Sequence, residues 1–175
     1  EQKDELIMLL DSVKAANANT VYFQVRGRCD AMYKSSYEPW SSDLVATRGM
    51  DPGYDPLLFA VEEAHKRGIE IHAWFNPYRY ESVLHQWDGT PQNYRESHPE
   101  WLLDYSDGSI LNPAMPEVRD HITAIIQEVV QNYDIDGVVF DDYFYTSGTT
   151  DDMDAELYQQ PRQPLSGRLA ASECK

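Results

Sequence analysis

The chain has 175 residues, 42% of them hydrophobic, and a formal net charge of −16 at pH 7. A chain of this length can bury a core, and its hydrophobic content argues against global disorder. The strong negative charge argues against nucleic acids and anionic lipid surfaces as partners, because both recruit basic proteins. The expected partner is a neutral or weakly charged molecule.

Two cysteines, Cys29 and Cys174, lie far apart and belong to no CxxC or zinc-ligand spacing. We therefore expect two unrelated thiols rather than a disulfide framework or a metal site. No run reaches the ~18 apolar residues of a membrane span. Glu1 leads almost directly into a predicted helix, so the chain is expected to be trimmed at its start and the lack of a visible leader says little about secretion.

The first part of the chain predicts a helix, a strand and a second helix. Leucines at helical spacing indicate a helix over residues 3–16, and residues 20–25 are rich in β-branched and aromatic side chains, which is typical of a strand. The second helix should have Asp55 as its N-cap and Pro56 in its first turn, and end at Gly68. The two faces of the strand are expected to carry Val21, Phe23 and Val25 on one side and Tyr22, Gln24 and Arg26 on the other.

The second part predicts a strand, a helix and a strand. Residues 69–75 form the next predicted strand, an amphipathic helix should run over residues 116–133, and residues 137–141 indicate a short buried strand. Alternating helices and strands form βαβ units with right-handed crossovers and a parallel sheet. A barrel and a doubly wound sheet both fit this order.

Two long loops distinguish one edge of the predicted sheet. About 30 residues follow the first strand and about 40 follow the second, whereas structureless loops beyond ~15 residues are usually functional or disordered. Both loops leave the carboxyl ends of strands, where parallel α/β folds place their sites. The sequence therefore predicts an active face at this edge.

Asp141 and Asp142 end the last predicted strand. A carboxylate at the carboxyl end of a buried strand costs desolvation energy, and a functional role commonly accounts for such a group. Alternation from Val139 points Asp141 inward, whereas Asp142 lies past the strand end and can turn either way. Tyr143 and the two aromatic residues after it would lower the local polarity. Alternatively, the two acids cap the next segment or bind a backbone amide.

Cations also gather at the strand ends. Arg26 and Arg28 follow the first strand, and Arg79 follows the second. They suggest a clamp on a carboxylate-bearing ligand or on a catalytic acid, although ordinary salt bridges to the 30 acidic residues explain them equally well. His72 could ligate a metal with Asp141, but without an HxH or HExxH motif we favour a hydrogen-bonded histidine inside the fold and expect no metal and no cofactor.

Nine stretches in fixed order resemble the landmarks of the glycosyl hydrolase-like 10 family and span residues 3–145. They are Val21-Tyr-Phe-Gln-Val-Arg26, Asp30-Ala-Met-Tyr33, Glu38-Pro-Trp-Ser41, Asp55-Pro-Leu57, Glu63-Ala-His-Lys-Arg-Gly68, His72-Ala-Trp-Phe-Asn-Pro-Tyr-Arg79, Leu111-Asn-Pro113, Pro116-Glu-Val-Arg119 and Asp136-Gly-Val-Val-Phe-Asp-Asp-Tyr-Phe-Tyr145. The resemblance implies a TIM-type barrel in an extracytoplasmic bacterial setting. It also implies hydrolysis of glycan chains, with cell-wall glycan stripped of its peptides as the suggested substrate class.

The positions of polar and aromatic residues at the strand ends, together with the resemblance, give a set of candidate site residues. Asp141 and Asp142 are the candidate catalytic carboxylates. The candidate substrate contacts are Arg26, His72, Trp74, Asn76, Tyr78, Arg79, Asn112 and Tyr143. A lactyl carboxylate on the sugar would give Arg26 or Arg79 a partner, and the aromatic rings that could stack on sugar faces include Trp40, Trp74, Tyr78 and Trp101.

A glycosidase needs a second carboxyl group, about 5 Å from the first if it is retaining and about 6.5–9.5 Å if it is inverting. The acids on the long loops that could supply it are Asp30, Glu38, Glu81 and Asp104, none of them favoured by its context. A strand outside this chain is the alternative source.

The chain departs from the family pattern at both ends. The family's opening strand is missing before the first helix, and Thr146 replaces the usual proline. We therefore expect residues 1–158 to form an incomplete (β/α)8 TIM-type barrel of the α/β class, with strands two to four and their helices, and residues 159–175 to be an irregular tail. Besides a glycoside hydrolase, a non-catalytic glycan-binding barrel, an inactive fragment and a metal-dependent barrel hydrolase stay open as functions.

Overall fold

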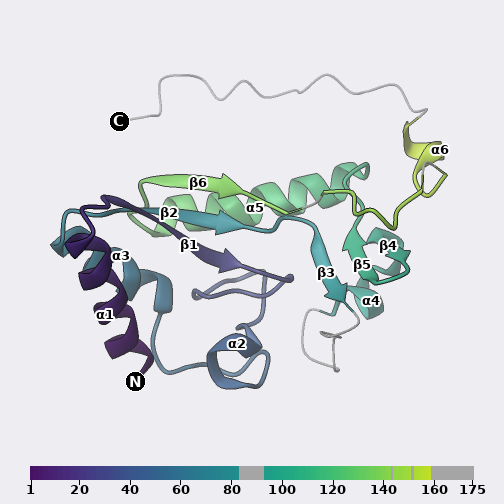
Figure 1. Cartoon of the computed structure of the whole chain (residues 1–175). Coiled ribbons are helices and arrows are strands. Elements are labelled where there is room, and N and C mark those ends of the chain that lie inside the picture. The colour runs from purple at the N-terminus through teal and green to yellow at the C-terminus, as the bar shows by residue number, and fades with distance from the viewer. Residues whose placement is uncertain (83–92, 143, 151, 159–175) are drawn as a thin grey trace.

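The protein is described by a computed structural model over residues 1–82, 93–142, 144–150 and 152–158. Three parallel strands form the main sheet in the order β1 (Thr20–Arg26), β2 (Glu70–Phe75) and β6 (Gly137–Phe140). The register pairs Tyr22 with His72 and Trp74 with Val139. The predicted parallel sheet is confirmed (Figure 1).

Three long helices alternate with these strands: α1 (Gln2–Ala15), α3 (Pro56–Lys66) and α5 (Pro116–Asn132). The predicted N-cap of α3 is confirmed, because the Asp55 carboxylate accepts a hydrogen bond from the Leu58 amide at 3.0 Å. Gly68 beyond its end has a φ of 65°, a left-handed conformation that glycine adopts without strain.

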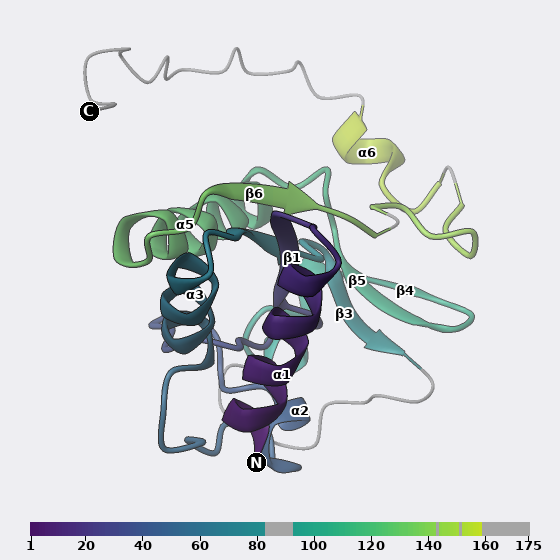
Figure 2. The ribbon, with the colours of Figure 1, turned by 60° about the vertical axis from the view of Figure 1, so that its left-hand side comes forward.

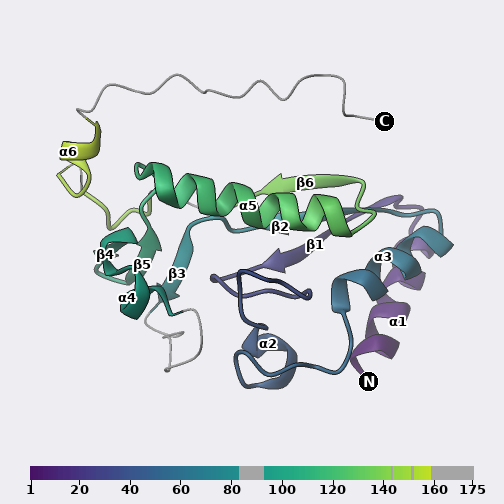
Figure 3. The same ribbon diagram turned by 180° about the vertical axis from the view of Figure 1, so that it is seen from behind.

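The core lies between the helices and one face of the sheet. Ile71, Ala73 and Phe75 of β2 are at most 1% exposed and belong to one buried cluster with apolar residues of α3 and α5. Seen from behind, α5 crosses in front of β6 and β2 and covers this face (Figure 3). Helices on a single face fit a barrel wall, because a doubly wound sheet carries helices on both faces.

The opposite face of the sheet is open in the described part of the chain. Tyr22 is 63% exposed, and its alternating neighbours Gln24, His72, Trp74 and Val139 are half-buried. With the molecule turned, α3 and α5 lie together on one side of β1 (Figure 2). A barrel would place this open face in its interior.

A bulge in β1 changes the predicted face of one residue. The register with β2 shifts between Gln24 and Arg26, so Arg26 pairs with Phe75 instead of continuing the alternation. Val25 and Arg26 are consequently both buried, at 0% and 1% exposure. The prediction that Arg26 shares a face with Tyr22 and Gln24 is wrong, because a bulge inserts one extra residue and shifts the side chains after it.

The loop after β2 contains a second sheet that the sequence analysis did not predict. Strands β3 (Arg79–Ser82), β5 (Gly108–Leu111) and β4 (Leu102–Tyr105) pair antiparallel in that order. Short helical segments, α4 (Tyr94–Ser97) and η1 (Pro99–Trp101), precede β4. The strands have four residues each, too few for a clear alternation signal.

The remaining elements are short. Helix α2 (Ser42–Val45) lies in the loop after β1, where Ala31 bridges to Arg26 and to Trp40. Helix α6 (Ala155–Tyr158) follows β6 beside the second sheet (Figure 1). None of the described helices is both long and apolar enough to cross a bilayer. The predicted irregular tail, residues 159–175, lies outside the described residues.

Gly137 at the start of β6 generates a prediction about stability. A Cβ atom at this position would lie 2.6 Å from Nδ1 of His72, so Gly137→Ala forces the imidazole to move. We expect a loss of about 1–3 kcal/mol in the free energy of unfolding, measured by urea denaturation. In a His72→Ala background the same substitution should cost much less, because the clash is removed.

The matched control for this prediction is Gly27→Ala. Its new Cβ would meet nothing closer than 3.8 Å, so it should leave stability nearly unchanged. An equal cost for Gly137→Ala with and without His72 would contradict the packing argument.

Candidate active site

Asp141 lies at the carboxyl end of β6 on the open face of the sheet. Its backbone amide donates to the carbonyl oxygen of Phe75 at 3.1 Å, which continues the β2–β6 ladder by one residue. The Phe140 ring tilts against the Phe75 ring, with centroids 6.3 Å apart, so Phe140 points to the helix side and Asp141 to the other. Its side chain is exposed, and within the described residues no group is hydrogen-bonded to its carboxylate.

Asp142 turns away from its neighbour and is held by Arg79. Its φ of 92° is a left-handed conformation that is uncommon for a residue with a side chain. Arg79 Nε donates to Oδ2 of Asp142 at 2.5 Å, and Nη2 donates to Oδ1. Because Asp142 is only 8% exposed, this bidentate pair joins the loops after β2 and β6 and raises the pKa of Arg79.

Trp74 and Asn76 lie beside Asp141 at the carboxyl edge of the sheet. The open-face side of this edge is called the mouth below. Trp74 Nε1 donates to the Asn76 side-chain oxygen at 3.0 Å, and the Asn76 amide donates to the Arg26 carbonyl at 2.9 Å. The indole is half-buried on the open face, since it pairs in register with Gln24 and Val139. An aromatic ring and an amide therefore flank the carboxylate, as in many ligand sites.

Arg26 lies beneath the mouth rather than in it. Its guanidinium donates to the carbonyl oxygens of Asn76 and Pro77 at 2.8 and 2.9 Å and to Oε1 of Glu38 at 2.8 Å. Both partners of this ion pair are at most 1% exposed. The predicted contact of Arg26 with substrate stays a prediction, but in this conformation the protein itself surrounds the side chain.

Tyr94 and His121 extend the buried polar network from Glu38 to α5. The Tyr94 hydroxyl donates to Glu38 Oε1 at 3.2 Å and lies 2.6 Å from Nε2 of His121. Burial raises the pKa of Glu38, although Arg26 opposes this shift. Burial, with a smaller contribution from the cation of Arg26, lowers the pKa of His121 to about 4.

The four acids predicted as candidates for the second carboxylate are held by other groups of the protein. Glu38 pairs with Arg26, and Asp30 accepts hydrogen bonds from Ser41 at 3.0 Å and Arg48 at 3.5 Å. On the second sheet, Glu81 and Asp104 both accept from Arg95 at 2.8 Å. Each of these carboxylates has a structural role.

Of two more predicted contacts, His72 lies away from Asp141 and Asn112 is buried. His72 pairs with Gly137, four residues before Asp141, which places it about 13 Å from the mouth along the strand. This separation rules out the alternative in which His72 and Asp141 share a metal ion. Asn112 is 4% exposed and accepts a hydrogen bond from the Ala114 amide at 2.9 Å before α5 begins.

The other predicted aromatics, Tyr78 and Trp101, and the cation Arg28 contact neighbouring side chains of the protein. Tyr78 meets Phe144 edge to face at 5.5 Å between the loops after β2 and β6, whereas Trp101 stacks on His98 at 4.1 Å. Arg28 pairs with Asp43 of α2. Tyr143 lies outside the described residues.

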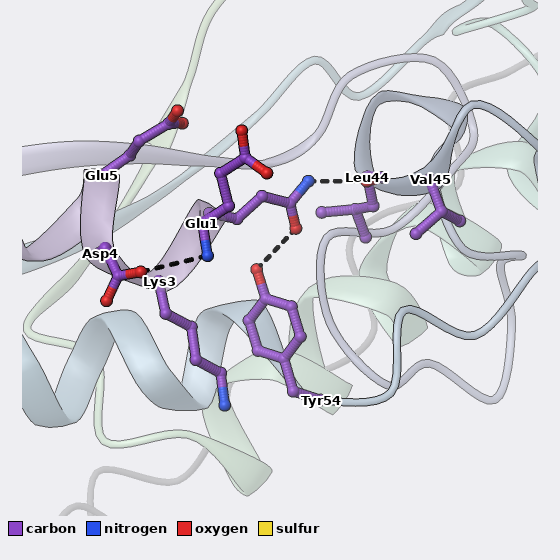
Figure 4. A pocket seen from close by; sticks show the side chains of 8 residues that line it. Glu1, Lys3, Asp4, Glu5, Leu44, Val45 and Tyr54 are labelled. Carbon is purple, nitrogen blue, oxygen red and sulfur yellow. Dashed lines mark hydrogen bonds and ion pairs between the residues drawn. The ribbon is translucent and has the colours of Figure 1, made fainter.

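A pocket of about 710 Å³ occurs elsewhere, between the first turn of α1, α2 and Tyr54 (Figure 4). The Gln2 side chain spans it, donating to the Leu44 carbonyl at 2.6 Å and accepting from the Tyr54 hydroxyl at 3.0 Å. No predicted site residue lines this pocket. Over the described residues, no group of three or more His, Cys, Asp or Glu side chains could hold a metal ion.

A parallel sheet with helices on one face and polar side chains at its carboxyl edge fits a partial α/β barrel. The model of the family Glycosyl hydrolase-like 10 matches residues 1–170, and the chain belongs to this family. It is 47% identical over 146 residues to Glycosyl hydrolase YngK of Bacillus subtilis and 42% identical over 154 residues to Glycosyl hydrolase DigH of Escherichia coli K12. The matches cover 83% of this chain but only 29% and 35% of those proteins, so the chain spans about a third of their length.

Solved structures share the fold at low sequence identity. The α-L-fucosidase isoenzyme 2 of Paenibacillus thiaminolyticus superimposes with a TM-score of 0.57 at 18% identity, covering 80% of this chain and 20% of that one. The α-galactosidase of Lactobacillus brevis gives a TM-score of 0.55 at 16% identity, covering 89% and 21%. These barrel glycosidases support an α/β partial barrel.

His121 predicts how stability depends on pH. Its pKa is about 4 when folded and about 6.5 when unfolded, so the unfolded state binds more protons between these values. The folded state therefore has its full stability above pH 6.5. As the pH falls toward 4, protonation of His121 in the unfolded state lowers the free energy of unfolding by about 2–3 kcal/mol. The free energy of unfolding should therefore fall more between pH 7.5 and pH 4.5 for the native chain than for His121→Gln.

The comparison between the two chains matters because Glu38, whose pKa is raised, contributes with the opposite sign. Taking the difference cancels the contributions of the surface acids. Glu38 lies 4.0 Å from His121, so its contribution cancels only where the substitution leaves the Arg26–Glu38 pair in place. Parallel pH profiles for the native chain and His121→Gln would show that the histidine is not desolvated.

Proposed function

We propose that this chain is part of a glycoside hydrolase that uses Asp141 as an essential carboxylate. The observation that carries the proposal is the position of Asp141, exposed at the carboxyl edge of β6 on the face opposite the helices. Barrel enzymes place their catalytic groups at this edge. Membership of the glycosyl hydrolase-like 10 family supports the reaction class.

In the proposed mechanism, Asp141 acts on the glycosidic bond either as nucleophile or as acid–base group. Asp142 does not share this task, because its carboxylate is already bound by Arg79. The Arg79–Asp142 pair instead fixes the backbone next to Asp141. The second carboxyl group comes from another strand of an eight-stranded barrel, since the four candidates on these loops have structural partners.

Trp74 and Asn76 are the proposed sugar contacts within the described residues. The indole offers an apolar ring for a sugar face, and the Asn76 side chain, already bonded to the indole, is preoriented toward the mouth. Tyr78 and Phe144 form an aromatic border where the loops after β2 and β6 meet. Arg79 is 33% exposed and is the cation best placed to meet an acidic group on the sugar.

The proposed substrate class is a bacterial cell-wall glycan without its peptides, hydrolysed outside the cytoplasm. The two named relatives, both bacterial glycosyl hydrolases, support the reaction class and the bacterial setting. The partial exposure of Arg79 fits a sugar that carries a lactyl carboxylate. A strongly acidic protein is also unsuited to binding nucleic acid.

A non-catalytic glycan-binding role is the second candidate. The observation that favours it is that other side chains bind all four candidate acids on the loops. Among the described residues, none of these four acids is then free to act as the second carboxylate. The 175-residue chain by itself should show no glycosidase turnover, because the described strands form only part of a barrel wall.

Asp141→Asn separates the two candidates when it is made in the longer protein that carries this chain. Removing the ionisable oxygen while keeping the shape should lower kcat on peptide-free glycan strands about 1,000-fold or more and leave the Kd of the glycan within a few-fold. Reducing-end release measures kcat, and calorimetry measures binding.

Asp134→Asn is the matched control, because this aspartate is 96% exposed at the opposite, amino-terminal end of β6. Its turnover should equal that of the native protein. Unchanged turnover in Asp141→Asn would overturn the proposed role, and binding without turnover in the native protein would favour the glycan-binding alternative.

A further inference from the structure

We infer that Arg26 and Glu38 form a buried positioning pair that fixes the segment after β2, so that Arg79 reaches Asp142. The catalytic consequence rests on the proposed function of Asp141, whereas the structural consequence does not. Neither residue touches the open face, so both would act through Arg79.

The Arg26 guanidinium binds two consecutive backbone carbonyls of this segment. Nη1 donates to Asn76 O at 2.8 Å and to Pro77 O at 2.9 Å. These residues directly follow β2, where the ladder with β1 ends and Pro77 has no amide hydrogen to donate. The guanidinium thus supplies hydrogen bonds to backbone that the sheet no longer holds.

Cys29 adds a third contact to the same segment. Its thiol accepts from Arg26 Nη2 at 3.1 Å and donates to the backbone carbonyl of Arg79 at 3.3 Å. Cys29 is fully buried, and its φ of 50° turns the chain back toward Arg26. Asn76, Pro77 and Arg79 are therefore all bound through their carbonyls, directly or through one thiol, to one guanidinium.

Glu38 holds the guanidinium in the orientation that these contacts need. Oε1 accepts from Arg26 Nη2 at 2.8 Å, whereas the Asn76 and Pro77 carbonyls bind Nη1. A buried ion pair of this kind is often no more stabilising than apolar side chains of similar volume. Apolar side chains, however, cannot donate hydrogen bonds to the Asn76 and Pro77 carbonyls, and this need explains the charged pair.

The position of the Arg79 backbone determines what its side chain can reach. Bidentate pairing with Asp142 requires a planar fork at a defined distance and angle, so a small backbone shift breaks at least one of the two hydrogen bonds. Asp142 keeps an uncommon positive φ, which needs external support. The pair thus links the buried Arg26 to the backbone beside Asp141.

The double variant Arg26→Met/Glu38→Leu tests the inference, because it removes both charges and leaves no buried ion unpaired. The readout is the Nε–H signal of Arg79 in nitrogen-15 NMR spectra of the 175-residue chain, assigned by its disappearance in Arg79→Lys. We expect the backbone amide spectrum to stay dispersed and exchange of this Nε–H with solvent to become about tenfold faster or more. In the longer protein, kcat should fall about 100-fold with little change in KM, because misplacement of a catalytic group affects mainly the chemical step.

Arg48→Met/Asp30→Asn is the matched control, since it also removes both charges of a buried ion pair, within the loop after β1. It should leave the Arg79 Nε–H signal unchanged. If the double variant does not fold, Arg26→Lys provides the same readout, because a single ammonium keeps the charge opposite Glu38 but cannot reproduce the planar fork.

The outcomes separate the inference from the proposed function. Faster Arg79 Nε–H exchange supports the positioning pair even if the native protein shows no turnover, which would count against the hydrolase proposal alone. Unchanged exchange in a folded variant overturns the positioning pair, whatever the effect of Asp141→Asn.

Discussion

The hydrogen bond from the Asp141 amide to the Phe75 carbonyl is the contact on which the site depends. It continues the β2–β6 ladder past the last assigned strand residue and so fixes the side on which each side chain lies. Phe140 then packs toward Phe75 and the helices, and Asp141 has to point the other way. A slip of one residue would exchange the two side chains and turn the carboxylate to the helix side of the sheet.

Two layers support this carboxylate. In the upper layer, the Arg79–Asp142 pair joins the ends of β2 and β6. In the lower layer, Arg26 binds the backbone from which Arg79 extends, and Glu38 binds Arg26. Tyr94 and His121 connect this pair to α5. Both layers use cations of a chain with net charge −16, so its scarce arginines neutralise acids at the functional edge of the sheet.

The small sheet β3–β5–β4 shows how part of a long loop can form regular structure and still belong to a site. Its first residue is Arg79, so the same strand that starts the small sheet also carries the clamp on Asp142. The β4–β5 hairpin turns through two residues, and Gly108 leaves room for the Glu81 carbonyl, which a Cβ atom would approach to 2.1 Å. The Ser106-Asp107-Gly108 run is a turn signal that could have indicated this hairpin.

Sequence reasoning predicted the elements that rest on local chemistry. The three long helices, the three parallel strands and the cap at Asp55 follow from periodicity and from residues that stabilise helix ends. The alternation that turns Asp141 away from the helices also lies within one short strand. Motif order along the chain identified the family, which the comparisons confirmed.

The tertiary structure decided what depends on partners far along the chain. The bulge that buries Arg26 results from the pairing of β1 with β2. Asp142 differs from Asp141 because it is bound by Arg79, which lies 63 residues away in the sequence. The sequence determined that chemistry-bearing side chains follow strands β1, β2 and β6. Which of them face the mouth and which support it from the core was decided only by packing, because a buried polar group lies wherever its hydrogen-bonding partners are.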